Sequence, residues 1–149
     1  MFNTIVVGTD GSTNAEKAVR AAVAIAKEQN AKLHIVTGAR PMTPEQLYEL
    51  KRSLPSEFWP QLHADYFSEE RLVSAQAICR AAGIEAVTHG HSSSGADAVL
   101  DVAEAHDADL IVVGSRGEGA AKRLVHGSVS TKILHHAPCS VLVIREDVV

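Results

Sequence analysis

The sequence of 149 residues lacks an excess of basic charge, long apolar runs and a recognisable export signal. Its 14 Lys and Arg stand against 18 Asp and Glu, a net charge of −4 with neutral histidines. Domains that bind nucleic-acid backbone usually carry excess positive charge. No apolar run approaches the roughly 20 residues that a membrane-spanning helix needs, and the N-terminus has neither a basic segment nor a cleavable apolar stretch. These absences predict a cytoplasmic protein with neither a nucleic-acid nor a membrane partner.

Cysteine is also scarce. Cys79 and Cys139 are the only two, far apart and without CxxC spacing, which argues against a disulfide framework or a zinc knuckle. Hydrophobic residues make up 46% and charged residues 21% of the chain, the mixture of an ordinary globular domain. Length and composition together predict a single domain over residues 1–149.

Short apolar runs alternate with segments of helical periodicity. Apolar or alternating runs predict strands at 4–8, 33–37, 84–89, 110–113 and 141–144. Apolar residues three and four apart predict helices near 15–26, 66–82, 96–103 and 128–136. Residues 39–65 contain four of the five prolines and are expected to form a long, partly helical excursion with one short helix near 45–51.

This order predicts an α/β fold, a doubly wound, parallel, five-stranded sheet with helices on both faces. In such folds ligands bind beyond the carboxyl ends of the strands, where the strand order reverses. Two loops at predicted strand ends carry glycines, at 8–12 and 114–117. A small-molecule site is expected there.

The second of these loops has the composition of a phosphate site. Glycines after a buried strand let the backbone approach a ligand, and Gly127-Ser128 opens a helix whose free N–H groups form an anion site. Residues 114–136 hold four basic residues against one acidic residue, so basic charge is concentrated where a nucleoside triphosphate would lie: Arg116, Lys122, Arg123 and Lys132. The alternative is that these glycines and serines are ordinary helix and strand boundaries. No Walker A loop and no dinucleotide GxGxxG is present.

The complete motif resembles that of the universal stress protein family. Gly114, Gly117, Gly127 and Ser128 match the family pattern G-x2-G-x9-G-[ST]. The segments 5–12, 108–117 and 137–144 match the family in the same order. The resemblance covers essentially the whole chain and implies a Rossmann-like fold of the adenine nucleotide α-hydrolase type.

The resemblance also implies the branch of the family that binds ATP, with Mg2+ carried on the phosphates. Gly8, Thr9 and Asp10 would flank the adenosine, with Asp10 near the metal, and Val113 and Gly38 would line the adenine pocket. The remaining implied residues lie along the ribose and phosphates: Gly114, Arg116, Gly117, Gly127, Ser128, Val129 and Ser130. Two departures stand out. The second strand ends in Thr37-Gly38-Ala39, where the family often has valine, and the loop 90–95 lacks a Gly-x-Pro step.

Catalytic and metal-binding constellations are sparse. His89 and His91 could share one strand face as metal ligands, but two ligands make a poor site, so no protein-held metal is predicted. No nucleophile–base pair can be argued, and no second carboxylate accompanies Asp10 in the motif. The sequence therefore predicts ATP binding with at most slow hydrolysis. The alternatives are a slow ATPase or an autophosphorylating enzyme, with Ser128, Ser130 or Thr131 as acceptor, and a pocket that binds nothing.

The last predicted strand, at 140–145, is apolar and followed by only four residues. An edge strand exposes unpaired backbone groups, and pairing with a second copy about a two-fold axis would cover them. Members of the resembled family often dimerise in this way. The sequence therefore predicts a homodimer formed through this strand.

Overall fold

The computed structural model describes residues 1–38, 43–61, 66–91, 93–115 and 128–145. Five parallel strands form one sheet: β1 (Thr4–Gly8), β2 (Lys32–Gly38), β3 (Ala86–His91), β4 (Leu110–Gly114) and β5 (Ser140–Ile144). The helices are α1 (Thr13–Gln29), α2 (Pro44–Ser53), η1 (Ser56–Gln61, a 3-10 helix), α3 (Tyr66–Ala81), α4 (Gly95–Ala105) and α5 (Ser128–His136). The strand order is β3-β2-β1-β4-β5. The predicted doubly wound, five-stranded parallel sheet is confirmed.

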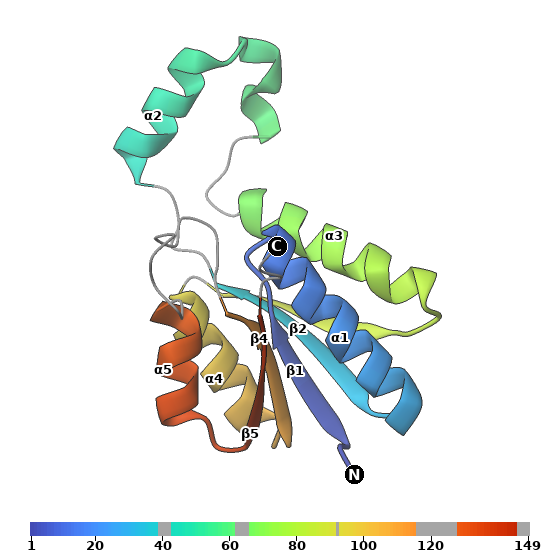
Figure 1. Ribbon diagram of the computed structural model, residues 1–149. Coiled ribbons are helices and arrows are strands. Elements are labelled where there is room, and N and C mark those ends of the chain that lie inside the picture. The colour runs from blue at the N-terminus through green and yellow to red at the C-terminus, as the bar shows by residue number, and fades with distance from the viewer. Residues whose placement is uncertain (39–42, 62–65, 92, 116–127, 146–149) are drawn as a thin grey trace.

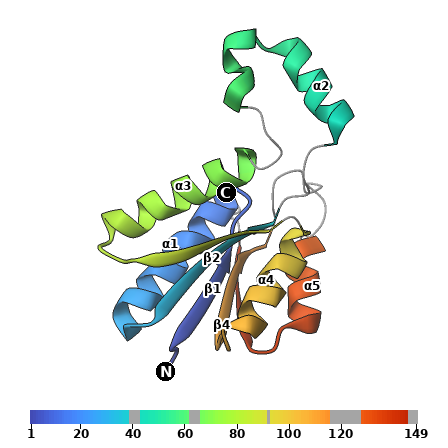
Figure 2. The ribbon, with the colours of Figure 1, turned by 180° about the vertical axis from the view of Figure 1, so that it is seen from behind.

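Helices cover both faces of the sheet, and each face has its own core. Figures 1 and 2 show α1 and α3 on one face and α4 and α5 on the other. Successive strand residues alternate between the two: Ile5 and Val7 pack with the α1 side, and Val6 packs with the α4 side. The central strands are therefore buried on both faces, which explains their continuous apolar sequence.

The first helix shows how local sequence sets an element. Ser12 caps it, since its Oγ accepts a hydrogen bond from the Ala15 N–H at 3.2 Å. Asn30, in the left-handed conformation at φ 54°, ends it. The buried face consists largely of small residues, which let the helix lie close to the sheet: Ala15, Ala18, Val19, Ala22, Val23 and Ala26.

Two elements differ from their sequence predictions. The strand β3 begins at Ala86, two residues after the predicted start, because Ile84 belongs to the end of α3. The Ile84 N–H donates to the Cys79 carbonyl at 2.9 Å, around Gly83 at φ 74°. The 3-10 helix η1 was not predicted. With α2, which buries none of its residues, it lies beyond the carboxyl edge of the sheet (Figure 1).

The sheet leaves β3 and β5 as its edges, so the edge position predicted for the last strand is confirmed.

Both cysteines are free: Cys79 is buried and Cys139 half-buried, and burial raises the pKa of each thiol. Within the described ranges, no helix combines the length and the apolarity needed to cross a bilayer.

Candidate nucleotide site

A pocket opens at the carboxyl edge of the sheet, between the ends of β1 and β4. Its volume, including the open space at its mouth, is about 480 Å³. The strand order reverses at this point, because the chain winds outward from β1 through β2 to β3 and then returns to β4 on the other side. The pocket therefore lies where doubly wound folds bind ligands.

Seven of the residues that the sequence assigned to a ligand line this pocket together: Gly8, Thr9, Asp10, Gly38, Val113, Gly114 and Val129. Three strand ends and the first turn of α5 bring them there. Of the others, Ser128 is the first residue of α5. Arg116, Gly117 and Gly127 lie outside the described residues, as do Lys122 and Arg123.

The pocket has an apolar wall that the sequence reading mostly missed. Ala15, Val36, Gly95 and Val99 also line it. Val36, one residue before Thr37, supplies a valine from β2 to this wall. The buried residues of β2 and the helical spacing of apolar residues in α4 mark Val36 and Val99 as buried. These sequence patterns do not show which strand lies opposite which helix, because that arrangement exists only in the folded protein.

The loop after β1 is a compact turn that holds Thr9 and Asp10 at the pocket. The Thr9 N–H donates to the Val36 carbonyl at 2.9 Å, which ties the loop to β2. One carboxylate oxygen of Asp10 accepts a hydrogen bond from the Ser12 N–H at 2.9 Å. Because Ser12 caps α1, this turn also directs the positive end of that helix toward the carboxyl edge of the sheet.

Close backbone approach explains Gly38. A Cβ atom there would lie 2.8 Å from the carbonyl oxygens of both Ser93 and Ser94 and 2.9 Å from the Gly95 Cα. These are backbone atoms, so the end of β2 and the start of α4 can adopt this spacing only with glycine. The narrow spacing positions the first turn of α4 at the pocket.

Ser115, at the start of the glycine-rich segment, forms hydrogen bonds with residues of three elements, β5, α1 and α5. The Ser115 N–H donates to the Ile144 carbonyl at 2.8 Å, and the Asn14 side chain donates to Ser115 Oγ at 3.5 Å. The Ser130 hydroxyl donates to the Ser115 carbonyl at 3.3 Å. Ser130 is 1% exposed and is not among the pocket-lining residues, so in this structure its hydroxyl joins α5 to β4.

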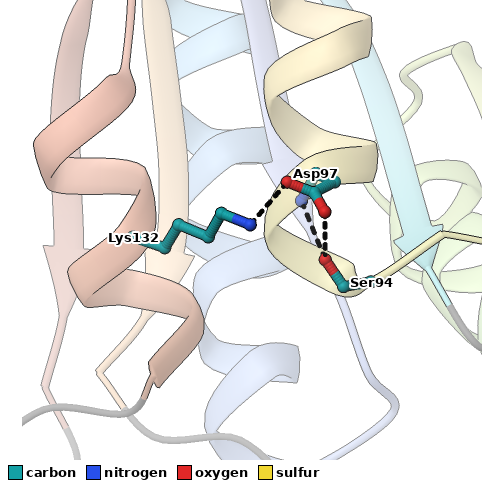
Figure 3. Close-up of polar contacts among 3 residues, drawn as sticks. All are labelled: Ser94, Asp97 and Lys132. Atoms are coloured by element: carbon teal, nitrogen blue, oxygen red, sulfur yellow. Dashed lines mark hydrogen bonds and ion pairs between the residues drawn. The ribbon is translucent and has the colours of Figure 1, made fainter.

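One of the four basic residues counted for the phosphate site has a partner elsewhere. Lys132 Nζ lies 2.7 Å from Asp97 Oδ1, joining α5 to α4, and Asp97 Oδ2 accepts a hydrogen bond from the Ser94 hydroxyl at 2.8 Å (Figure 3). Lys132 was counted in the positive charge of residues 114–136, and in the structure the Asp97 carboxylate offsets its charge. The tertiary fold pairs it with a carboxylate 35 positions away in the sequence.

The pocket's chemistry is that of a binding site. Its described lining includes a single ionisable side chain, Asp10, beside the Thr9 hydroxyl and a wall of valines. Val129, at 41% exposed, leaves apolar surface beside the opening. This combination accommodates a flat apolar ring together with a polar or charged group.

Comparison with known proteins identifies the family. The model of the universal stress protein family matches residues 1–145. A putative universal stress protein of Staphylococcus aureus strain USA300 is 33% identical over 98% of this chain and 86% of its own length.

Solved structures agree with this match. A universal stress protein in complex with cAMP is 30% identical, with a TM-score of 0.69 over 96% of both chains. The universal stress protein UspA from Lactobacillus plantarum is 27% identical, with a TM-score of 0.74 over 96% of this chain and 97% of its own. With the fold, the pocket and the glycine pattern in agreement, this chain belongs to the universal stress protein family.

Proposed function

We propose that this chain binds an adenine nucleotide in the pocket between β1 and β4, and acts in the stress response through binding. The observation that carries the proposal is the pocket itself, which gathers seven sequence-assigned residues at the topological switch point. The relative solved with cAMP, with 30% identity, supports an adenine ligand.

The two ends of the pocket suit the two ends of a nucleotide. Val36, Val99 and Val113 offer an apolar wall for the base. The phosphates would extend toward the first turn of α5, where the positive end of the helix dipole favours anions. Gly8 and Gly114 are both in the lining, and at each a Cβ atom would lie 2.8 Å from a neighbouring side chain, that of Val99 at Gly8 and that of Asn14 at Gly114.

ATP is the nucleotide we propose, because the chain carries the complete pattern Gly114-x2-Gly117-x9-Gly127-Ser128. Asp10 fits a role beside Mg2+ bound to the phosphates, since carboxylate oxygen is a ligand that this ion favours. The described lining offers no second carboxylate to position a water molecule. We therefore propose regulation through binding, with ATP turnover far below one per second, the low end of typical enzyme rates.

Nucleotide released from the purified protein by denaturation, and identified by mass, tests the ligand directly. ATP at 100 times its Kd should stabilise the fold by about 2.7 kcal/mol. That corresponds to a rise in Tm of roughly 5–10 °C for a chain of this size. GTP is the control nucleotide, and ADP production measures turnover. Absence of bound nucleotide together with an unchanged Tm would overturn the proposal, and turnover above about one per second would favour the enzyme.

A change of Gly95 to valine should lower ATP affinity without unfolding the protein. Among the described residues, a Cβ at this position meets Val129 alone, at 3.7 Å and 3.9 Å from its γ carbons, which is ordinary contact. The β carbon of the new side chain therefore fits the fold, and its γ carbons take up pocket volume. We expect Kd to rise at least about tenfold, the equivalent of 1.4 kcal/mol, as measured by isothermal titration calorimetry.

The matched control is the same replacement at Gly90, an exposed residue of the edge strand β3 that does not line the pocket. A Cβ there meets only Leu72 Cδ1, at 3.7 Å. Gly90→Val should bind ATP like the unchanged protein. Equal affinity in Gly95→Val and Gly90→Val would place the nucleotide elsewhere on the protein.

We also propose that two copies pair through β5. This strand is an edge of the sheet, and its residues from Val141 to Ile144 are only half-buried. An apolar edge with unpaired backbone groups is a template for another strand, and a two-fold axis closes the pairing. Light scattering behind size exclusion should give the mass of two chains. A single-chain mass at micromolar concentration would contradict this assembly.

A further inference from the structure

Three histidines that are distant in the sequence gather at the opposite edge of the sheet from the pocket. His34 lies on β2, His89 on β3, and His106 is the C-cap residue of α4. One ring nitrogen of each lies within 4.8 Å of the other two. The sequence had paired His89 with His91 instead. In the structure His89 instead lies beside His34 and His106, because β2 pairs with β3 and α4 ends over β2.

The rings are already arranged around a common centre. His34 Nδ1 and His89 Nε2 are 2.9 Å apart, and the centroids of the His34 and His106 rings are 4.3 Å apart. Exposure increases from His34, which is 6% exposed, through half-buried His89 to exposed His106. The cluster thus has a fixed inner ring and an outer ring that can rotate.

We propose that His34, His89 and His106 form a binding site for a divalent transition-metal ion, with Zn2+ as the representative ion. Three imidazole nitrogens with a solvent-facing fourth position form the open tetrahedral arrangement that zinc adopts. With Zn–N bonds of about 2.0–2.1 Å, ligand nitrogens in such a site lie about 3.3 Å apart. His34 Nδ1 and His89 Nε2, now 2.9 Å apart, would separate slightly, and the longer separations, which are at most 4.8 Å, would shorten by about 1.5 Å or less. His106 is the exposed ring of the three and has room to adjust.

The groove beside the cluster carries charges of both signs and leaves access for an ion. His34 and His106 line a groove with Lys32, Glu85 and Val87. Val87 is 55% exposed, so this part of β3 is uncovered. His106 is at the C-terminal end of α4, where the helix dipole is negative and stabilises positive charge. Among the described residues, none lines both this groove and the nucleotide pocket, so these two groups of residues are separate.

The protonation state also suits a metal. Burial, with a smaller contribution from the charges of His106, His89 and Lys32, lowers the pKa of His34 to about 4. Burial, followed by His106 and His91, also lowers the pKa of His89. These two rings are therefore neutral at physiological pH, and metal coordination requires the neutral form. Glu85 is the one acidic residue among the described residues that line the groove.

Titration of the chelator-treated full chain with Zn2+, followed by calorimetry, tests the site, and Co2+ absorption reports the geometry. We expect one ion per chain, and at least about a tenfold weaker Kd in His89→Gln and in His106→Gln, as for loss of a ligand or its immediate support. The matched control is His136→Gln, an exposed histidine at the end of α5 outside the cluster. It should bind like the unchanged protein.

Circular dichroism and Tm without metal establish that each variant is folded. His106→Gln changes an exposed side chain, so it keeps the test valid if His89→Gln is destabilised. Three results would overturn the proposal: no saturable binding of one equivalent, the same Kd in His106→Gln as in the unchanged protein, or an equal loss in His136→Gln. The Gly95→Val variant should retain Zn2+ binding, which separates this test from that of the nucleotide pocket.

Discussion

Replacing Gly38 with alanine is expected to lower the free energy of unfolding by about 2–3 kcal/mol, the upper part of the range for overpacking. The new Cβ would lie 2.8 Å from two carbonyl oxygens, those of Ser93 and Ser94. Neither can yield by a side-chain rotation, so β2 and the start of α4 must separate. Because Gly38 and Gly95 both line the pocket, the same movement should weaken ATP binding.

Chemical denaturation measures this loss, and calorimetry measures the binding. Gly90→Ala is the matched control, since its Cβ meets only the end of the Leu72 side chain, at 3.7 Å. We expect that control to stay within about 0.5 kcal/mol of the unchanged protein. If Gly38→Ala is as stable as Gly90→Ala, the tight approach of β2 to α4 is not a feature of the protein in solution.

Replacing Ile111 with alanine is expected to cost about 3–4 kcal/mol, in the middle of the range for large-to-small changes in a core. Ile111 lies on the interior strand β4, is 0% exposed and packs with Val6, Val99 and Ile133. Strands on both sides hold β4 in place, so the backbone has little freedom to close the cavity. The loss would be a large part of the stability typical of a domain, 5–15 kcal/mol.

Two further variants calibrate this result. Ile111→Val removes one methylene group and should cost about 1 kcal/mol. Val87→Ala removes apolar surface on β3, where the side chain is 55% exposed, and should change stability by less than about 0.5 kcal/mol. A loss in Ile111→Ala no greater than that in Val87→Ala would contradict the burial of β4 between two helix layers.

Much of the fold could be predicted because its signals are local. The apolar run of β4 ends at Gly114, and the small residues of α1 recur with helical spacing from Ala15 to Ala26. Such patterns depend on neighbours within about one or two turns. The start of β3 was misplaced for the same reason, since Ile84 is apolar whether it lies in a strand or closes the end of α3.

The part of the candidate site that consists of glycines and cap residues at strand ends could be predicted from the sequence. The apolar wall could be predicted only in part. Gly8, Thr9 and Asp10 follow directly after a strand, so their place at the carboxyl edge is implied by the fold class. Val36 and Val99 resemble any core valine in the sequence. Their role depends on which elements lie across the pocket from each other, which is a long-range property.

The parallel sheet, the order of its strands and main helices along the chain, and the glycine-bearing edge proposed for a nucleotide could all be inferred from the sequence. These features follow from short-range periodicity and from the handed, outward winding of β-α-β units. Which charges pair and which histidines meet became known from the folded structure. Lys132 lies against Asp97, and His34 joins His89 and His106. These contacts are made across separate elements, and no pattern within a single element encodes them.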